Sequence, residues 1–379
     1  LYAHKKNWLL PVSMIFFVFS FYTFNANRIL APLFIGLLSI IYARQLFTQK
    51  KWVVISLLIG IIMLVPSIGY LQSRESRLRF EEVSIFTSLD VVKKANERIA
   101  RNNNAWWAKI IHNRRVYFFQ EFLVHYFDNF KGDFLFVSGD GNPRLSTQDI
   151  GEMYLFEAPF LVIGLLYFLL KHNKNSALLL GWMLLAPIPA ATARETPHML
   201  RIASIMPIFQ VISAMGIYIV WQWLKAKQQI IKYGTAGVFM SISLGSFIYY
   251  QHNYWVHYPV IWAGEWQYGY KQMVEDVEKR EGQYDKVLIT DYKGRPYIYF
   301  LLYSQMNPME YMKVRRAERD WYGLWNVYGY GKYEFAQYVP KTGEKILKVA
   351  QPGTYGTSPK KLEDVVDPSG NVVFEIGEL

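Results

Sequence analysis

The feature that most constrains this chain is a series of long apolar runs in its first two thirds. Seven runs stand out, at residues 8–24, 29–47, 52–70, 154–170, 176–191, 202–223 and 233–251. Each approaches the ~20 residues that an α-helix needs to cross ~30 Å of hydrocarbon. We therefore expect an α-helical polytopic membrane protein, with a transmembrane domain of about seven spans at 1–251 and a soluble α/β domain at 252–379.

The short loops between these runs give an orientation. Lysines gather at alternate ends of the runs, at Lys5, Lys6, Lys50, Lys51, Lys171, Lys174, Lys225, Lys227 and Lys232. The positive-inside rule assigns that side to the cytoplasm. The large loop at 71–153 and the C-terminal domain are then expected to be extracytoplasmic.

Charge and motif content exclude several function classes. Lys and Arg number 41 against 30 Asp and Glu, a net charge of +11, but the basic residues are divided between two sides of the expected membrane, which argues against nucleic acid as a partner. The absence of cysteine excludes disulfides and thiolate chemistry. Neither a CxxC nor an HExxH motif occurs, so no metal ligands are predicted. The GxSxG motif of a serine nucleophile is also absent. Spans nearly free of charge, without an internal repeat, argue against a transporter.

Two segments of the large loop have a definite pattern. Residues 88–104 predict an amphipathic helix that begins after Ser88 and has Val92, Ala95 and Ile99 on one face. The next segment, residues 105–130, is dense in Trp, Tyr and Phe. It suits either the headgroup layer of a membrane or a soluble helix packed on the C-terminal domain.

A polar turn follows at residues 139–143, and it carries Asp140, Asn142 and Arg144. Asp, Gly, Asn and Pro are the residues that a turn requires, so a purely structural role is one interpretation. Substrate binding by these three side chains is the other.

The C-terminal third predicts alternating helices and strands. Residues 264–283 predict a helix, 284–291 a strand, and 295–305 a second helix. Residues 365–379 predict a hairpin that turns at Pro368, Ser369 and Gly370.

The most informative stretch is ARETPHMLR at 193–201, between two apolar runs. It brings Arg194, His198 and Arg201 into one short loop, which Pro197 stiffens. Snorkelling of the arginines into lipid headgroups is the simplest interpretation. Crowding of two arginines with a histidine instead favours an anion site, because a guanidinium is well shaped to bind phosphate. Arg28, at the outer end of another run, would join it, and a lipid phosphate is the expected ligand.

The stretch ARETPHMLRIASIMPIFQVISAMGIY resembles the late-span region of C-type (GT-C) membrane glycosyltransferases. The similarity is to bacterial relatives of the polyprenyl-phosphate-mannose protein mannosyltransferases and of the lipid A aminoarabinose transferases. His198, Arg201, Pro207, Ala214 and Gly216 carry it. The stretches HNRRVYFFQEFLVHYF, DFLFVSGDGNPR and NANRILAPLF resemble other outer loops of the same proteins. The motifs are diffuse and extend from about residue 20 to the C-terminal domain.

The resemblance implies an enzyme of the bacterial cytoplasmic (inner) membrane. It would transfer a sugar, with inversion, from a polyprenyl-phosphate carrier to a hydroxyl of a protein, lipid or glycan. Arg28, Arg194, His198 and Arg201 would bind the donor phosphate. A carboxylate would deprotonate the acceptor or hold a divalent metal. In the family that acid lies in the first outer loop, whereas the loop before Arg28 contains only Asn-Ala-Asn. We therefore expect the catalytic acid and several spans to lie upstream of Leu1.

Two alternatives share the basic outer loop. A lipid-linked glycan ligase or polymerase would also bind a carrier phosphate, although such ligases usually lack a soluble α/β domain. A non-catalytic envelope protein is the alternative from a different class.

Overall fold

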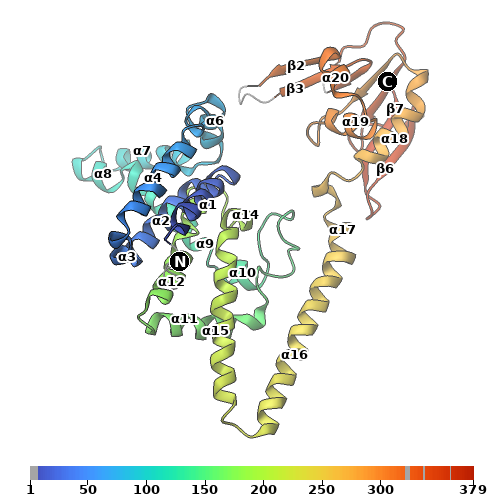
Figure 1. The fold of residues 1–379 in the computed structure, drawn as a ribbon. Helices are drawn as coiled ribbons and strands as arrows, with labels where there is room; N and C mark the ends of the chain where they lie inside the picture. Colours follow the sequence, from blue (N-terminus) through green and yellow to red (C-terminus); the bar gives the residue numbers. More distant parts are fainter. Residues whose placement is uncertain (1–6, 321–324, 336–337, 359) are drawn as a thin grey trace. The chain divides into compact units, whose positions relative to one another are not determined.

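The computed structural model describes residues 7–320, 325–335, 338–358 and 360–379 (Figure 1). The chain forms two compact units, Leu1–Tyr250 and Gln251–Leu379. The sequence placed its domain boundary between residues 251 and 252. The predicted cytoplasmic pair Lys5 and Lys6 lies outside the described residues.

The first unit is built of helices. They are α1 (Leu9–Thr23), α2 (Asn27–Ile41), α3 (Ala43–Thr48), α4 (Lys50–Leu64), α5 (Ser67–Leu71), α6 (Arg74–Val83), η2 (Ile85–Thr87), α7 (Leu89–Arg101), α8 (Trp106–Ile111), α9 (Arg114–Asp128), α10 (Gly132–Phe136), η3 (Leu155–Glu157), α11 (Ala158–Leu170), α12 (Lys174–Leu185), α13 (Ile188–Ala191), α14 (Met199–Ile202), η4 (Ala203–Ile205), α15 (Met206–Leu224) and α16 (Gln229–His252).

The predicted polytopic membrane bundle is wrong. Among the described residues, one continuous helical stretch, Met199–Leu224, is long and apolar enough to cross a membrane, judged by length and composition. The fold is instead a set of mostly shorter helices joined to a domain with a seven-stranded mixed sheet. The expectation that the C-terminal domain is extracytoplasmic depended on that bundle and loses this support.

Helix length explains most of the correction. Helices α1, α2 and α4 have 15 residues each, or about 22 Å at 1.5 Å per residue, which is short of ~30 Å of hydrocarbon. Two predicted spans are divided at prolines, because proline lacks the N–H that would continue a helix. Pro66 separates α4 from α5, and Pro187 separates α12 from α13.

Helix α16 is not a candidate membrane span for a different reason. Its 24 residues are long enough to cross a bilayer. Its glycine, serine, tyrosine and glutamine residues make it less apolar than Met199–Leu224, and it does not qualify as a candidate span. The predicted run at 233–251 is therefore a helix without the composition of a membrane span.

Two glycines set the closest helix crossing in this unit. A Cβ at Gly164 of α11 would lie 1.9 Å from the Ile212 carbonyl oxygen, and one at Gly216 of α15 would lie 1.9 Å from the Phe160 carbonyl oxygen. The backbones of α11 and α15 therefore touch where neither helix has a side chain, as small residues permit. Ile208 and Ile212 on α15 pack beside this crossing with Phe168 of α11.

The predicted amphipathic helix at 88–104 is confirmed as α7. Ser88 stands at its N-cap position, although its side chain makes no capping hydrogen bond. Ala95 is buried, as expected of the apolar face, and the helix ends at Asn102.

The second unit contains a mixed sheet with helices packed on it (Figure 1). Its elements are η5 (Asn253–His257), α17 (Tyr258–Ile261), η6 (Ala263–Trp266), α18 (Tyr270–Arg280), η7 (Glu281–Gln283), β1 (Lys286–Ile289), α19 (Tyr297–Tyr303), α20 (Pro308–Val314), β2 (Arg315–Arg319), β3 (Trp325–Tyr330), β4 (Tyr333–Phe335), β5 (Ile346–Ala350), β6 (Lys361–Val366) and β7 (Val372–Glu378).

The strand order is β2-β3-β4-β1-β5-β7-β6. Strand β1 is parallel to β4 and β5, and the remaining pairs are antiparallel. The predicted helices and strand are confirmed as α18, α19 and β1, and the predicted C-terminal hairpin as β6 and β7. The core of the second unit is centred on four fully buried side chains, Val287, Phe300, Leu347 and Phe374.

Candidate functional site

The loop at 193–201 is held in place by the polar side of α9. The Ala193 carbonyl oxygen is 2.8 Å from His125 Nδ1, and the Thr196 hydroxyl donates to Asp128 Oδ2 at 2.8 Å. Both His125 and Asp128 are buried. The Thr196–Pro197 peptide is cis. The loop is thus fixed to a helix more than 60 residues away in sequence.

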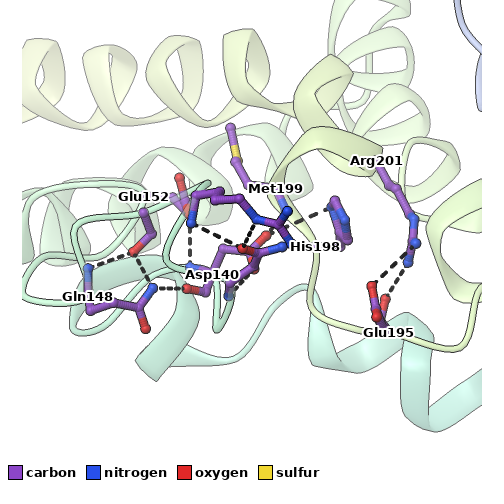
Figure 2. A network of polar contacts seen from close by, with 10 residues as sticks. Asp140, Gln148, Glu152, Glu195, His198, Met199 and Arg201 are labelled. Carbon is purple, nitrogen blue, oxygen red and sulfur yellow. Dashed lines mark hydrogen bonds and ion pairs between the residues drawn. The ribbon is translucent and has the colours of Figure 1, made fainter. Parts of the chain in front are cut away.

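Asp140 joins this loop to the polar turn. Its Oδ2 accepts a hydrogen bond of 2.6 Å from the Met199 backbone N–H, and its Oδ1 accepts one of 2.8 Å from the Asn142 N–H. Its own N–H donates to Glu152 Oε1 at 3.1 Å, and Gln148 Nε2 donates to its carbonyl oxygen. Asp140 is only 2% exposed. The Asp140 carboxylate therefore joins residues 142 and 199, and the Asp140 backbone N–H adds Glu152 to the same network (Figure 2).

His198 lies against this carboxylate. Its Nδ1 is 3.8 Å from Asp140 Oδ2, too far for a hydrogen bond, and it has no hydrogen-bond partner within the described part of the chain. Burial lowers the pKa of His198, and the positive charge of Arg201 lowers it further, against the opposing effect of Asp140. A neutral ring with a buried, unpartnered nitrogen can accept or donate one hydrogen bond to a ligand.

Arg201 is a second predicted phosphate ligand, and its charge acts on His198. Its guanidinium donates to the Glu195 carbonyl oxygen at 2.8 Å and is 3.6 Å from the Glu195 carboxylate. Figure 2 shows His198 between Asp140 and Arg201. The Arg201 side chain is 22% exposed, whereas that of Glu195 is 76% exposed. A partly exposed guanidinium beside a solvated carboxylate can also bind an anionic ligand.

The other two predicted phosphate ligands lie elsewhere. Arg194 donates from its side chain to the Ser84 and Glu81 carbonyl oxygens and to the Thr87 hydroxyl, each at 3.2 Å. It thereby binds the loop to the segment between α6 and α7.

Arg28, at the start of α2, faces aromatic rings. Its guanidinium carbon lies 5.1 Å from the centre of the Tyr70 ring and 5.8 Å from that of Phe21. Its Nε is buried and has no hydrogen-bond partner among the described residues. The structure records no contact between Arg28 and the loop at 193–201 in the described residues.

Asn142 and Arg144 contact each other in the turn. Asn142 Oδ1 accepts hydrogen bonds from the Arg144 N–H at 3.0 Å and from Arg144 Nε at 3.3 Å. This is the turn geometry that asparagine favours. Among the three residues predicted to bind substrate, Asp140 contacts the loop of His198 through Met199.

Glu152 is the residue that sequence reasoning left without a role. Burial raises its pKa to about 7; the Asp140 N–H opposes that shift and the Asp140 charge adds to it. Glu152 lines a pocket of about 280 Å³, together with Ile150, Gly151, Met153, Tyr154, Glu157, Gln210 and Tyr250. A carboxyl that titrates near neutral pH beside a cavity has the properties of a general base.

The sequence carried a weak signal for Glu152. It lies 12 residues after Asp140, beyond the polar turn at residues 139–143, and no motif includes it. Its burial depends on segments α15 and α16, which are distant in sequence, so its pKa could not be inferred from the residues around it.

No group of three or more His, Asp and Glu side chains within the described ranges could hold a metal ion. The chain matches no family model, and no curated protein and no solved structure is similar to it. The functional argument therefore rests on the cluster of Asp140, His198 and Arg201 and on the pocket at Glu152.

Proposed function

We propose that this chain is a membrane-bound glycosyltransferase that moves a sugar from a polyprenyl-phosphate carrier to an acceptor hydroxyl. The observation that carries the proposal is the buried, unpartnered Nδ1 of His198 in a loop that also presents Arg201. Such a pair can bind a phosphate oxygen through one ring nitrogen and one guanidinium fork.

The position of this pair along the chain supports a lipid-linked donor. His198 directly precedes Met199–Leu224, the candidate membrane helix, and Arg201 lies in its first turn. The lysines at 225, 227 and 232 follow its other end. By the positive-inside rule the His198 end would face outward from the bacterial cytoplasmic membrane, where a carrier phosphate is accessible.

In place of the upstream acid that the family resemblance implies, the proposed reaction uses Glu152 as the base. An acceptor hydroxyl in the pocket gives its proton to the Glu152 carboxylate as its oxygen bonds to the anomeric carbon. The bond from that carbon to the phosphate oxygen breaks, and its electron pair leaves with the phosphate. Attack from the face opposite the leaving group inverts the anomeric centre. Arg201 stabilises the charge that develops on the leaving phosphate.

His198 has a different task from Glu152. Its lowered pKa keeps it mostly neutral at pH 7, so it offers a hydrogen bond instead of a second charge. Asp140 would act as a positioning residue, since its two acceptor bonds hold residues 142 and 199 in place.

The test is a transfer assay with purified protein, a polyprenyl-phosphate-linked sugar and a hydroxyl acceptor. We expect Arg201→Ala to lower turnover about 100- to 1000-fold, the usual cost of removing one oxyanion donor. Arg201→Lys should recover part of the loss, because a point charge replaces a fork. Arg44→Ala, an exposed arginine of α3, is the matched control and should behave as the unsubstituted protein.

Glu152→Gln gives the second arm. It should abolish turnover while leaving donor binding intact, because the amide cannot accept the proton. Undiminished transfer by both Arg201→Ala and Glu152→Gln would refute the site. Binding of the donor without any transfer by the unsubstituted protein would refute the enzymatic role and favour a lipid-phosphate-binding envelope protein.

A further inference from the structure

Helix α9 has its polar and apolar faces reversed relative to an ordinary surface helix. His125 and Asp128 point inward, where they hold the loop at 193–201. Its exposed stripe is apolar, interrupted by Gln120, and consists of Val116, Phe119, Leu123, Val124 and Phe127. These residues follow the i, i+3, i+7, i+8, i+11 spacing of one helix face.

Helix α8 is separated from α9 by two residues and also exposes apolar side chains. It exposes Trp106, Trp107, Ile110 and Ile111, with Trp106 76% exposed. Single exposed apolar residues are normal on a monomer, whereas so many exposed apolar residues close together in the sequence indicate an interaction surface. Tryptophan is favoured at the boundary between lipid and water, since its ring is apolar and its N–H is polar.

The charges around this surface indicate what covers it. The segment from Leu89 to Arg115 contains seven basic and two acidic residues. Lys109, Arg114 and Arg115 flank the apolar residues of α8 and α9, and within the described chain none of the three forms an ion pair. A basic rim around apolar and aromatic groups is complementary to anionic lipid headgroups above an acyl layer.

We propose that α8 and α9 dock on the surface of an anionic lipid bilayer, with Phe119 and Trp106 inserted among the upper acyl chains. This inference is independent of any catalytic role. It would hold the loop at 193–201 about one helix diameter, ~10 Å, from the lipid surface, because α9 separates the two.

The test uses the absence of cysteine, which makes any introduced thiol a unique label site. Phe119→Cys carries an environment-sensitive fluorophore, and the protein is mixed with vesicles whose acyl chains bear bromine as a quencher. Equal parts of phosphatidylcholine and phosphatidylglycerol are compared with phosphatidylcholine alone. A label at this position is needed because the protein could also bind vesicles through Met199–Leu224, and vesicle binding alone would not show whether α9 contacts lipid.

We expect strong quenching at position 119 with the anionic vesicles and weak quenching with the neutral ones. Glu121→Cys is the matched control, because this side chain faces His125 on the polar side of α9. Its label should remain unquenched. Replacing Lys109, Arg114 and Arg115 with glutamine should weaken the affinity for anionic vesicles about 100-fold, since each basic residue near the surface contributes about 1 kcal/mol, or about fivefold.

Three results would overturn the proposal. The first is a label at position 119 that bromine does not quench in anionic vesicles. The second is quenching that is equal in neutral vesicles and unchanged by the triple glutamine variant. The third is a blue shift that grows with protein concentration without vesicles, which would identify a second copy of the chain as the occupant.

Discussion

Removal of the Asp140 carboxylate should destabilise the first unit strongly, because this buried group accepts hydrogen bonds from two backbone N–H groups. Asp140→Ala leaves the N–H groups of Asn142 and Met199 without their acceptor. An unsatisfied buried donor costs about 1–3 kcal/mol, so the pair costs about 2–6 kcal/mol. Asp140→Asn should cost about half as much, since its amide oxygen can still accept one bond but carries no charge.

Thermal unfolding, followed by circular dichroism in a mild detergent, measures this cost. One kcal/mol shifts Tm by about 2–4 °C in a domain of this size, so Asp140→Ala should lower Tm by roughly 4–24 °C. Asp149→Ala removes an exposed carboxylate of the same turn and is the matched control. Its Tm should shift by no more than about 2 °C. Equal shifts in the two variants would refute the role assigned to Asp140.

Two further predictions concern Glu152 and the helix crossing. Because the Glu152 pKa is raised to about 7 from 4.5, its protonated form stabilises the fold at low pH, and this contribution is lost as pH rises through about 7. Between about pH 5 and pH 8, the free energy of unfolding of Glu152→Gln should therefore change by about 2 kcal/mol less than that of the unsubstituted protein, allowing for partial exposure. Denaturant titrations at the two pH values test this, and an unaltered pH dependence in Glu152→Gln would contradict it. Gly164→Ala should prevent the close approach to Ile212 and lower stability by at least about 2 kcal/mol in the same titrations, while Gly36→Ala, with open space around it, should be neutral or slightly stabilising. A stable Gly164→Ala variant would mean that α11 and α15 do not meet as described.

Local patterns in the sequence predicted many of the elements. The amphipathic pattern of α7 and the turn residues of the β6–β7 hairpin depend on neighbouring residues, and both were found where expected. The continuity of the apolar runs was not predicted correctly. Hydrophobicity alone was given more weight than Pro66 and Pro187, which divide two of the runs into helices too short to span a bilayer.

The candidate site was predicted only in part. The sequence proximity of His198 and Arg201 indicated a shared site. In the structure His198 lies against Asp140 and Arg201 against Glu195, and the Arg201 charge lowers the His198 pKa. The contact between Asp140 and Met199 joins residues 59 positions apart, so no local pattern could reveal it. The same holds for Arg194, whose partners at residues 81–87 are more than 100 positions away.

The central claim is that His198 and Arg201 bind a lipid phosphate. Calorimetric titration of the detergent-solubilised protein with farnesyl phosphate, and separately with farnesol, tests it most directly. We expect binding of the phosphate but not of the alcohol, and loss of that binding in Arg201→Ala but not in Arg44→Ala. Equal binding of both compounds, or phosphate binding unaffected by Arg201→Ala, would contradict the account.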